Sequence, residues 1–160
     1  MRSRTLLVAT GYAELGMWSE AWDELEAIDD AARVSFDVLA LRLEVLVQLK
    51  RWEPAAILAD SLIAKGVTAA EIFLNGAYAV RRCRSLTEAK EFLLKGPHLA
   101  GKDPHFHFNL ACYECQLGNI PAAKEQLEHA FKLDASLRED ALDDPDLEPL
   151  WGADTQLREG

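Results

Sequence analysis

Two cysteines separated by two residues are the first side chains in this sequence that could carry chemistry. Cys112 and Cys115 form a Cys-x-x-Cys pair, a spacing found in dithiol redox centres and in zinc sites. Redox pairs are activated by a helix N-terminus, which lowers the thiol pKa, whereas this pair falls in the middle of an expected helix. We therefore expect small thiols that line a surface. A metal-responsive or thiol-responsive role through this pair remains the alternative.

A zinc site would need more ligands than the two thiols, because structural zinc is held by four protein groups. His105 precedes Cys112 by seven residues, which is roughly 10 Å along a helix axis and near the limit for one metal ion. His107 is expected on another face of the same helix, and Cys83 lies at the end of a different helix, so neither is expected to complete a zinc site. We therefore expect neither a metal ion nor a cofactor.

The sequence contains no recognisable catalytic constellation. It has no glycine-rich phosphate-binding loop and no serine in the context of a nucleophile elbow. No histidine stands at a spacing from a serine or cysteine that is typical of a catalytic pair. The four histidines are His98, His105, His107 and His129. The carboxylates are scattered over expected solvent faces, where they usually only increase solubility. We therefore predict that the protein is not an enzyme.

The elements that must position the thiols are two helices within residues 103–134. The first helix is apolar and carries the small residue Ala111 near its middle, and a turn at Gly118 follows it. The second helix has apolar residues at spacings of four and three, which places them on one stripe. The pattern resembles one tetratricopeptide (TPR) repeat. Its hallmarks here are Leu110, Ala111, Gly118, Ala123, Leu127 and Ala130.

The same pattern recurs along the whole chain at the TPR period of 34 residues. Small residues stand at Ala21, Ala55, Ala89 and Ala123, and a second column contains Ala9, Leu43, Ala77 and Ala111. The turn column contains Gly16, Lys50, Arg84 and Gly118, and the large apolar residues that open each second helix are Trp18, Trp52, Leu86 and Ile120. Two helices cross closely only where no bulky side chain intrudes. The small columns therefore predict four helix hairpins.

We predict an all-α fold, a right-handed α-α superhelix (solenoid) of four TPR-like helix hairpins with a C-terminal capping helix. Residues 1–160 are expected to form a single domain, with repeats at about 2–34, 36–68, 70–102 and 104–135 and a cap at 136–152. The first six helices are expected at about 5–15, 19–32, 36–49, 52–65, 68–82 and 85–96. Expected N-cap residues are Ser19, Ser35, Ser85, Asp103 and Asn119, whose side chains can accept hydrogen bonds from free amides.

The residues after Asp134 depart from the repeat. A solenoid needs a terminal cap with one polar face, because its last repeat otherwise exposes a stacking surface. The side chains that can cover that surface are Leu142, Leu147, Leu150 and Trp151, and the interleaved carboxylates are expected to face water. We favour a cap over an acidic interaction tail.

The charge and composition of the chain restrict the partners it can have. The net charge is −10, which argues against nucleic acid because neutralising phosphates requires a basic face. The sequence shows no secretion signal and no apolar stretch long enough to span a membrane. Three cysteines, an odd number, fit a reducing compartment. We expect a cytoplasmic protein that binds neither nucleic acid nor a membrane.

The TPR resemblance implies a binding groove, because the first helix of each TPR hairpin lines the concave face of the array. The candidate peptide-binding residues on the third and fourth first helices are Asn75, Tyr78, Arg81, Arg82, His105, Phe108, Asn109, Cys112 and Gln116. Their amides could hold a peptide backbone, the rings could hold apolar side chains, and the arginines could hold a carboxylate. Arg81 and Arg82 could instead only pair with nearby carboxylates at a helix end.

The resemblance does not extend to the chaperone-binding TPR proteins, which clamp a C-terminal carboxylate. Only Asn75 fits their clamp, since Ala40, Glu44 and His105 stand where the other clamp residues are sought. We expect a non-enzymatic scaffold or adaptor that binds a protein or peptide and is a monomer or weak homodimer. A third possibility is an assembly module that homodimerises through the first hairpin, with Trp18 and Trp22 at the contact.

Overall fold

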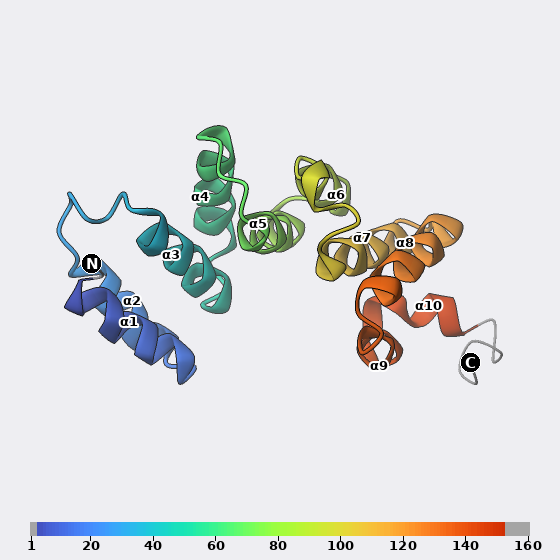
Figure 1. The fold of residues 1–160 in the computed structure, drawn as a ribbon, viewed down its shortest axis with the longest axis horizontal. Coiled ribbons are helices and arrows are strands. Elements are labelled where there is room, and N and C mark those ends of the chain that lie inside the picture. Colours follow the sequence, from blue (N-terminus) through green and yellow to red (C-terminus); the bar gives the residue numbers. More distant parts are fainter. Residues whose placement is uncertain (1–2, 153–160) are drawn as a thin grey trace. The chain divides into compact units, whose positions relative to one another are not determined.

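The structure is a computed structural model that describes residues 3–152, and this range is built from helices without a β-strand (Figure 1). The first five helices are α1 (Arg4–Glu14), α2 (Trp18–Glu26), α3 (Phe36–Gln48), α4 (Trp52–Ala64) and α5 (Ala70–Cys83). They are followed by α6 (Leu86–Leu93), the 3-10 helix η1 (Pro97–Leu99), α7 (Pro104–Gln116) and α8 (Ile120–Leu133). The chain then forms α9 (Leu137–Asp143), the 3-10 helix η2 (Pro145–Leu147) and α10 (Glu148–Trp151).

The chain divides into two compact units, residues 1–83 and residues 84–160. The N-terminal unit contains α1 to α5 and the C-terminal unit contains α6 to α10. The division falls between α5 and α6, the two helices that the repeat pattern assigns to the third hairpin. Each unit is described below by itself, and the single domain over residues 1–160 stays a prediction.

The small columns of the repeat lie at buried helix contacts. No side-chain surface is exposed at Ala21, Ala55, Ala89 and Ala123. The second column is buried to the same extent, at Ala9, Leu43, Ala77 and Ala111. Within the N-terminal unit α1 packs on α2 and α4 packs on α5, and within the C-terminal unit α7 packs on α8. The burial confirms the role predicted for these columns, because a larger side chain would hold the paired helices apart.

The turn column is visible in the backbone at three of its four positions. Gly16, Lys50 and Gly118 have φ angles of 71°, 59° and 85°, in the left-handed region. In each turn the amide donates a 3.0 Å hydrogen bond to the carbonyl of the residue three positions earlier, which for Lys50 is Val47. Left-handed backbone is unfavourable for a residue with a side chain, so Lys50 keeps the turn geometry of the repeat at a cost in stability.

Helix α2 ends at Glu26, six residues before the predicted end at Ala32. The side chain of Arg33 folds back on this end: its Nε donates a 2.7 Å hydrogen bond to the carbonyl of Ile28, and its Nη2 donates to the carbonyl of Glu26. Asp29 accepts a 3.0 Å hydrogen bond from the amide of Ala32. A carboxylate is unfavourable near a helix C-terminus, so Asp29 supports a turn here and not a further helical turn.

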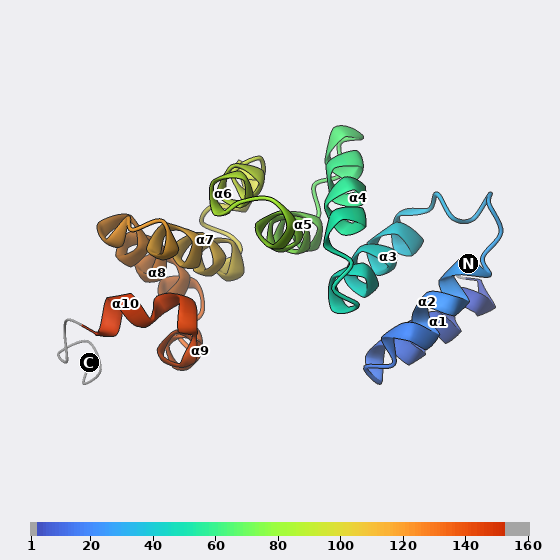
Figure 2. The same ribbon diagram turned by 180° about the vertical axis from the view of Figure 1, so that it is seen from behind.

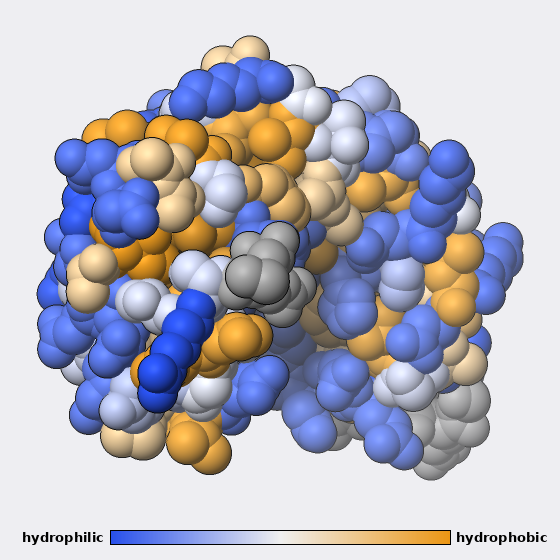
Figure 3. Space-filling model, turned by 60° about the vertical axis from the view of Figure 1, so that its left-hand side comes forward, coloured by the Kyte–Doolittle hydropathy of each residue, from blue (hydrophilic) through white to orange (hydrophobic). Residues whose placement is uncertain are grey.

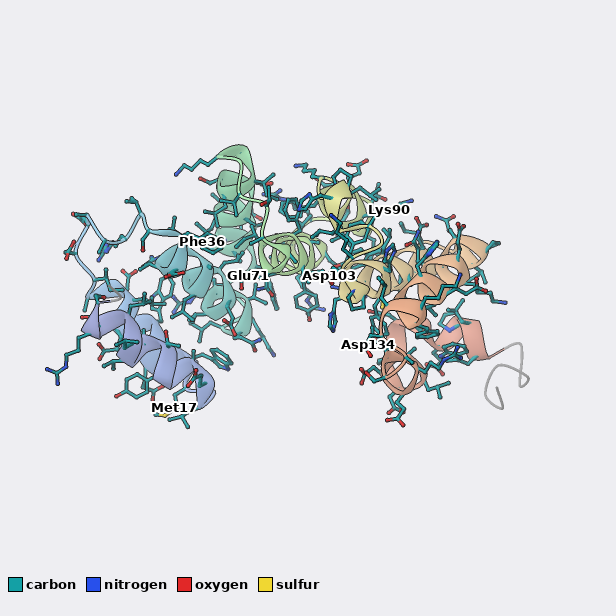
Figure 4. All side chains as sticks on the ribbon, in the orientation of Figure 1. Met17, Phe36, Glu71, Lys90, Asp103 and Asp134 are labelled. Carbon is teal, nitrogen blue, oxygen red and sulfur yellow. The ribbon has the colours of Figure 1, made fainter. Side chains whose placement is uncertain are left out.

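Two predicted N-caps are confirmed. The Ser85 hydroxyl accepts a 3.1 Å hydrogen bond from the amide of Glu88. The Asp103 carboxylate, labelled at the start of α7 in Figure 4, accepts hydrogen bonds of 2.8 Å from the amide of His105 and 3.2 Å from that of Phe106. Both caps therefore fix the start of a helix in the C-terminal unit.

Three other predicted caps make no capping hydrogen bond, although Ser35 and Asn119 occupy the predicted N-cap positions. Helix α2 begins at Trp18, so Ser19 lies inside the helix. The side chain of Ser35 makes no capping hydrogen bond at the start of α3. Asn119 precedes α8 but does not cap it, because its Nδ2 donates a 2.7 Å hydrogen bond to Glu114 of the preceding helix. The second helices α2 and α8 therefore start from the turn geometry and not from a capping side chain.

The segment after α8 forms the predicted cap. In the C-terminal unit η2 packs on α7 and α9 packs on α8 (Figures 1 and 2). Leu147, Leu150 and Trp151 are buried, and the Trp151 indole nitrogen donates a 3.1 Å hydrogen bond to the Ala141 carbonyl. The prediction for Leu142 is wrong, because that side chain is 45% exposed.

Candidate functional site

A cleft of about 220 Å³ lies on the first helices of the N-terminal unit. It is formed by α1, α3 and α5, which are the helices that the repeat pattern places on the binding face. Leu6 and Phe36 contribute apolar surface to its lining. The carboxylates of Asp37, Glu44 and Glu71 also line it. The cleft is therefore acidic, and a cationic group is the complementary ligand.

Two of these carboxylates influence each other. Partial burial, and then the negative charge of Glu71, raise the pKa of Glu44 above the usual range of a glutamate. Both effects disfavour a second negative charge in the cleft. A bound cation would reverse this, because an opposite charge favours the ionised carboxylate.

An aromatic and cationic cluster lies farther along α5. The rings of Trp52 and Tyr78 meet edge to face, with centroids 5.5 Å apart and planes at 78°. The guanidinium carbon of Arg82 lies 5.4 Å from the centroid of the Trp52 ring. Tyr78 is 41% exposed, and Arg82 is also exposed. These three residues, called the Trp52 cluster below, offer flat apolar surface beside a positive charge.

The cleft and the Trp52 cluster share one stripe of α5. Glu71, Asn75, Tyr78 and Arg82 follow one another at spacings of four, three and four residues, which places them on the same helix face. The opposite face is buried, as Phe73 and Val80 show with 2% and 1% exposed surface. Arg82 lies in the last turn of α5, where the helix dipole favours a cation. The stripe therefore runs from an acidic end to a basic end.

Of the predicted residues of α5, Asn75 lies on this stripe and Arg81 lies beside it. Asn75 is half-buried between the acidic and basic ends, and Arg81 is half-buried in the last turn. Four of the predicted binding residues are therefore gathered in the N-terminal unit. The carboxylates of Asp37, Glu44 and Glu71 were absent from the predicted site. Their positions on the first helices were the available signal, but their mutual electrostatic effect depends on the packing of α3 against α5.

The predicted binding residues of α7 lie in the C-terminal unit and are partly covered. His105 is exposed and Asn109 is half-buried, whereas Phe108 and Cys112 are buried. The side-chain amide of Gln116 donates a 2.8 Å hydrogen bond to the backbone carbonyl of Asp146. A ligand on this part of α7 would have to compete with the capping segment.

The Cys112 thiol lies beside carboxylates that sequence spacing did not connect with it. Its Sγ is 3.8 Å from a carboxylate oxygen of Asp144. One ligand atom from each of Cys112, Asp144 and Asp146 lies within 4.8 Å of the other two. These residues could hold a metal ion through three groups, one fewer than a structural zinc site requires. The aspartates come from η2 and its N-cap, about thirty positions later in the chain, so no local spacing could have revealed them.

The second thiol of the pair is not activated. Burial, and then the negative charge of Asp146, raise the pKa of Cys115, and these effects outweigh a hydrogen bond with the Leu150 backbone. A thiol with a raised pKa stays protonated at neutral pH, whereas reactive cysteines are thiolates. Cys115 is therefore expected to be unreactive at neutral pH.

A buried carboxylate in the C-terminal unit has a structural explanation. Glu114 is 7% exposed, and one of its oxygens lies 2.6 Å from the ammonium group of Lys90 on α6, a residue that Figure 4 labels. The other oxygen accepts the hydrogen bond from Asn119. Both oxygens are therefore satisfied, and the pair ties α6 and the turn after α7 to α7 itself.

A buried histidine in the same unit is also satisfied. His107 is 5% exposed, and its Nε2 accepts a 2.8 Å hydrogen bond from the amide of Gly101. Its Nδ1 lies 2.8 Å from the side-chain oxygen of Gln126 and therefore carries the proton. The ring joins the loop before α7 to α8, which is a structural role and agrees with the expectation that it lies apart from the thiol face.

Among residues 3–152, no helix combines the length and the apolar character that crossing a bilayer requires. No protein-family model matches the chain, and no curated protein matches its sequence.

Two solved structures of MamA resemble this one. The first, "MamA RS-1 ArsTM double mutant", aligns with a TM-score of 0.72 and 17% sequence identity over 82% of this chain and 74% of its own. The second, MamA from residue 41 to its end from Desulfovibrio magneticus RS-1, aligns with a TM-score of 0.73 and 17% identity over 82% of this chain and 75% of its own. The similarity is one of fold, and it confirms the predicted all-α class of TPR-like helix hairpins with a C-terminal capping helix.

Proposed function

We propose that this protein is a non-enzymatic scaffold or adaptor that binds an extended segment of a partner protein along the first helices of its N-terminal unit. The observation that carries the proposal is the cleft of about 220 Å³ on α1, α3 and α5, together with the Trp52 cluster on the same stripe of α5. This surface matches the binding face that the TPR resemblance implies.

The charge along the stripe defines the ligand. Glu71 and Arg82 are eleven residues apart, which is roughly 16 Å along the helix. An extended peptide covers that distance with about five residues at roughly 3.3 Å each. Lysine or arginine in the peptide would pair with the acidic cleft at one end. A carboxylate would pair with Arg82, which can hold it in two parallel hydrogen bonds.

The middle of the stripe supplies contacts that do not depend on charge. Asn75 carries an amide that can donate to a peptide carbonyl and accept from a peptide amide. Tyr78 and Trp52 offer ring surface for one apolar side chain between the charged ends. The expected ligand is therefore basic at one end, apolar in the middle and acidic at the other end.

The α7 residues His105, Phe108, Asn109, Cys112 and Gln116 form a separate candidate surface on the C-terminal unit. Binding there would require the capping segment to release Cys112 and Gln116, which contact Asp144 and Asp146. We therefore assign peptide binding to the N-terminal unit.

A peptide library tests this proposal directly. Immobilised wild-type protein would be used to select from displayed random peptides of about ten residues, and the selected sequences would be read. We expect enrichment of peptides with a basic residue and an acidic residue about five positions apart. Selection by Arg81→Glu with Arg82→Glu should lose the acidic preference, whereas the control Arg4→Glu with Lys65→Glu should keep it. If the peptides selected by the wild-type protein showed no charge preference, the proposal would be contradicted.

Exposed apolar side chains on α1 favour homodimerisation as a second candidate. Leu7 is 54% exposed, Val8 is 40% exposed and Leu15 is 75% exposed. In Figure 3, which brings the N-terminal side forward, hydrophobic patches lie between hydrophilic side chains. The predicted contact residues Trp18 and Trp22 are instead partly buried against the core of the first hairpin.

Sedimentation velocity separates this second candidate from a monomeric scaffold. If α1 is a dimer contact, the wild-type protein should sediment as a dimer at high concentration, and Leu7→Gln with Leu15→Gln should sediment as a monomer. A monomeric wild-type protein at concentrations up to about 100 μM would rule out this assembly role, because a contact weaker than that supplies less than about 6 kcal/mol.

A further inference from the structure

A pocket of about 440 Å³ opens between α8, α9 and α10 in the C-terminal unit. This volume lies within the range of protein ligand sites, roughly 300–1,000 Å³. The pocket is formed by α8, which is the last helix of the repeat array, and by the capping segment. It uses none of the residues assigned to the proposed peptide groove. Three of its lining residues, Leu127, Leu150 and Trp151, are repeat or cap residues of the sequence pattern, which predicts no binding role for them.

The floor of the pocket is apolar and fixed in place. Leu127, Leu150 and Trp151 line it and are 3%, 2% and 9% exposed. The indole nitrogen of Trp151 donates its hydrogen bond to the Ala141 carbonyl, which holds the ring in one orientation. Phe131 adds a half-buried ring to the wall. The pocket can therefore take up an apolar side chain without rearranging.

The rim of the pocket is positively charged. Lys124, Lys132 and Arg138 line it, and none of the three forms an ion pair with another residue of the described range 3–152. The Arg138 guanidinium lies instead 4.9 Å from the centroid of the Phe131 ring. In a chain with 27 acidic and 17 basic residues, three cations without an ion-pair partner among residues 3–152 surround this apolar pocket, so an anionic ligand is complementary to it.

One carboxylate also lines the pocket. Glu128 lies four residues from Lys124 and four from Lys132, a spacing that often supports ion pairs on a helix. Neither pair forms among the described residues. Glu128 therefore leaves both lysines available, and its own charge opposes an anion in the pocket.

The spacing of the cations selects one kind of ligand. Lys124 and Lys132 are eight residues apart on α8, which is roughly 12 Å along the axis. A ligand that places one carboxylate near each lysine is complementary to this spacing. We propose that the pocket is a second interaction site, which binds a segment of a partner protein with one large apolar residue flanked on both sides by carboxylates. The apolar residue enters the floor, and the flanking carboxylates meet the lysines and Arg138.

The charge complementarity of this site is tested with two synthetic peptides. Both are capped, fluorescein-labelled nine-residue peptides with a central leucine; one has glutamates on both sides, and the other has glutamines at those positions. Fluorescence anisotropy of the full-length protein should show that the glutamate peptide binds at least tenfold more tightly. This preference should shrink as salt is raised, because screening weakens exposed charge pairs. Equal binding of the two peptides would overturn the proposal.

Protein variants locate the interaction. Lys132→Gln with Arg138→Gln should weaken binding of the glutamate peptide at least tenfold. The control Lys102→Gln removes an exposed charge from a loop of the same unit and should leave binding unchanged. Glu128→Gln should strengthen binding severalfold, a gain that loss of folding cannot produce. Unchanged binding by the double variant, or weaker binding by Glu128→Gln, would overturn the proposal.

Two further experiments test which molecule fills the pocket. A glutamate peptide with alanine in place of the central leucine should bind at least tenfold more weakly, since the floor would stay unfilled. Equal binding of that peptide would reduce the site to a charged surface and overturn the proposal. Sedimentation of the protein alone covers the case of a second copy. A dimer that Lys132→Gln with Arg138→Gln dissociates would show that another copy fills the pocket, which also overturns the peptide assignment.

Discussion

The side-chain amide of Gln116 donates a 2.8 Å hydrogen bond to the backbone carbonyl of Asp146. This bond joins a first helix of the repeat to the segment that caps the array. The nearby contact of 3.8 Å between Cys112 and Asp144 joins the same two elements. The cap therefore lies on part of the α7 surface that the repeat pattern assigns to ligand binding, in addition to covering the last hairpin.

Deleting residues 136–160 should destabilise the C-terminal unit. The deletion exposes the apolar surface that Leu147, Leu150 and Trp151 cover, all of which are buried in the intact chain. We expect a loss of several degrees in the melting temperature or aggregation, measured by circular dichroism and light scattering. A monomeric truncated protein with an unchanged melting temperature would show that this segment is a tail and not a cap.

Replacing Lys50 with glycine should stabilise the N-terminal unit. Lys50 has a φ of 59°, a conformation that glycine adopts without a steric penalty. We expect Lys50→Gly to raise the free energy of unfolding by up to about 1 kcal/mol, because the added flexibility of the unfolded chain offsets part of the gain. Lys65→Gly is the matched control: Lys65 also ends a helix but has a φ of −84°, so that variant should gain nothing. A loss of stability in Lys50→Gly would count against the turn assignment.

The thiol pair should be dispensable for partner binding and for metal content. Cys112→Ser with Cys115→Ser should leave both nearly unchanged, as measured by peptide anisotropy and by elemental analysis of protein purified without added metal. Stoichiometric zinc in the wild-type protein that disappears in the double variant would instead establish the Cys112, Asp144 and Asp146 group as a metal site. Asp146→Asn should then lower the metal content as well.

The pKa of Cys115 leads to a second expectation for the same pair. Because burial and Asp146 raise this pKa, Cys115 should react slowly with iodoacetamide at neutral pH. Its rate should rise only at a pH above that at which a free cysteine reacts. Fast alkylation near pH 7 would contradict this environment.

Neutralising Glu44 should stabilise the protein at neutral pH and have less effect in acid. The pKa of Glu44 is raised in the folded state, by partial burial and then by Glu71. A group whose folded pKa is raised supports the fold while it is protonated, and that support is lost as the pH rises through its folded pKa. Glu44→Gln should therefore raise the melting temperature at pH 7, and the gain should diminish below the ordinary pKa of a glutamate. An equal gain at both pH values would contradict the electrostatic explanation.

The 34-residue period predicted the packed pairs α1 with α2, α3 with α4 and α7 with α8 because it reports local packing. It did not predict that α4 packs closely on α5, a helix that the pattern assigns to the next hairpin. Ala55 and Ala123 are fully buried, and Lys50 adopts the turn conformation of Gly118 despite its side chain. These features recur in every hairpin that has the same small residues, so one sequence was sufficient to find them. Part of the proposed binding stripe, with Asn75 and Tyr78 on α5, followed from the same register.

The parts that the sequence did not predict depend on contacts between residues far apart or outside the repeat. Helix α2 ends early where the Arg33 side chain donates hydrogen bonds to the carbonyls of Glu26 and Ile28. Helix propensities do not predict such a contact. Asp144 contacts Cys112 although the two residues are about thirty positions apart in the sequence, so local spacing could not reveal the contact. The acidic character of the N-terminal cleft requires α3 and α5 to bring Glu44 and Glu71 together.

The central claim, that the first helices of the N-terminal unit bind an extended peptide, is tested most directly by the affinity of library-selected peptides for Arg81→Glu with Arg82→Glu. Anisotropy titrations would compare this variant with the wild-type protein and with the control Arg4→Glu with Lys65→Glu, and circular dichroism melts would verify that all three are folded. We predict at least a tenfold loss of affinity for the α5 variant and no change for the control. Wild-type affinity in the folded α5 variant would contradict the claim and remove the binding site from α5.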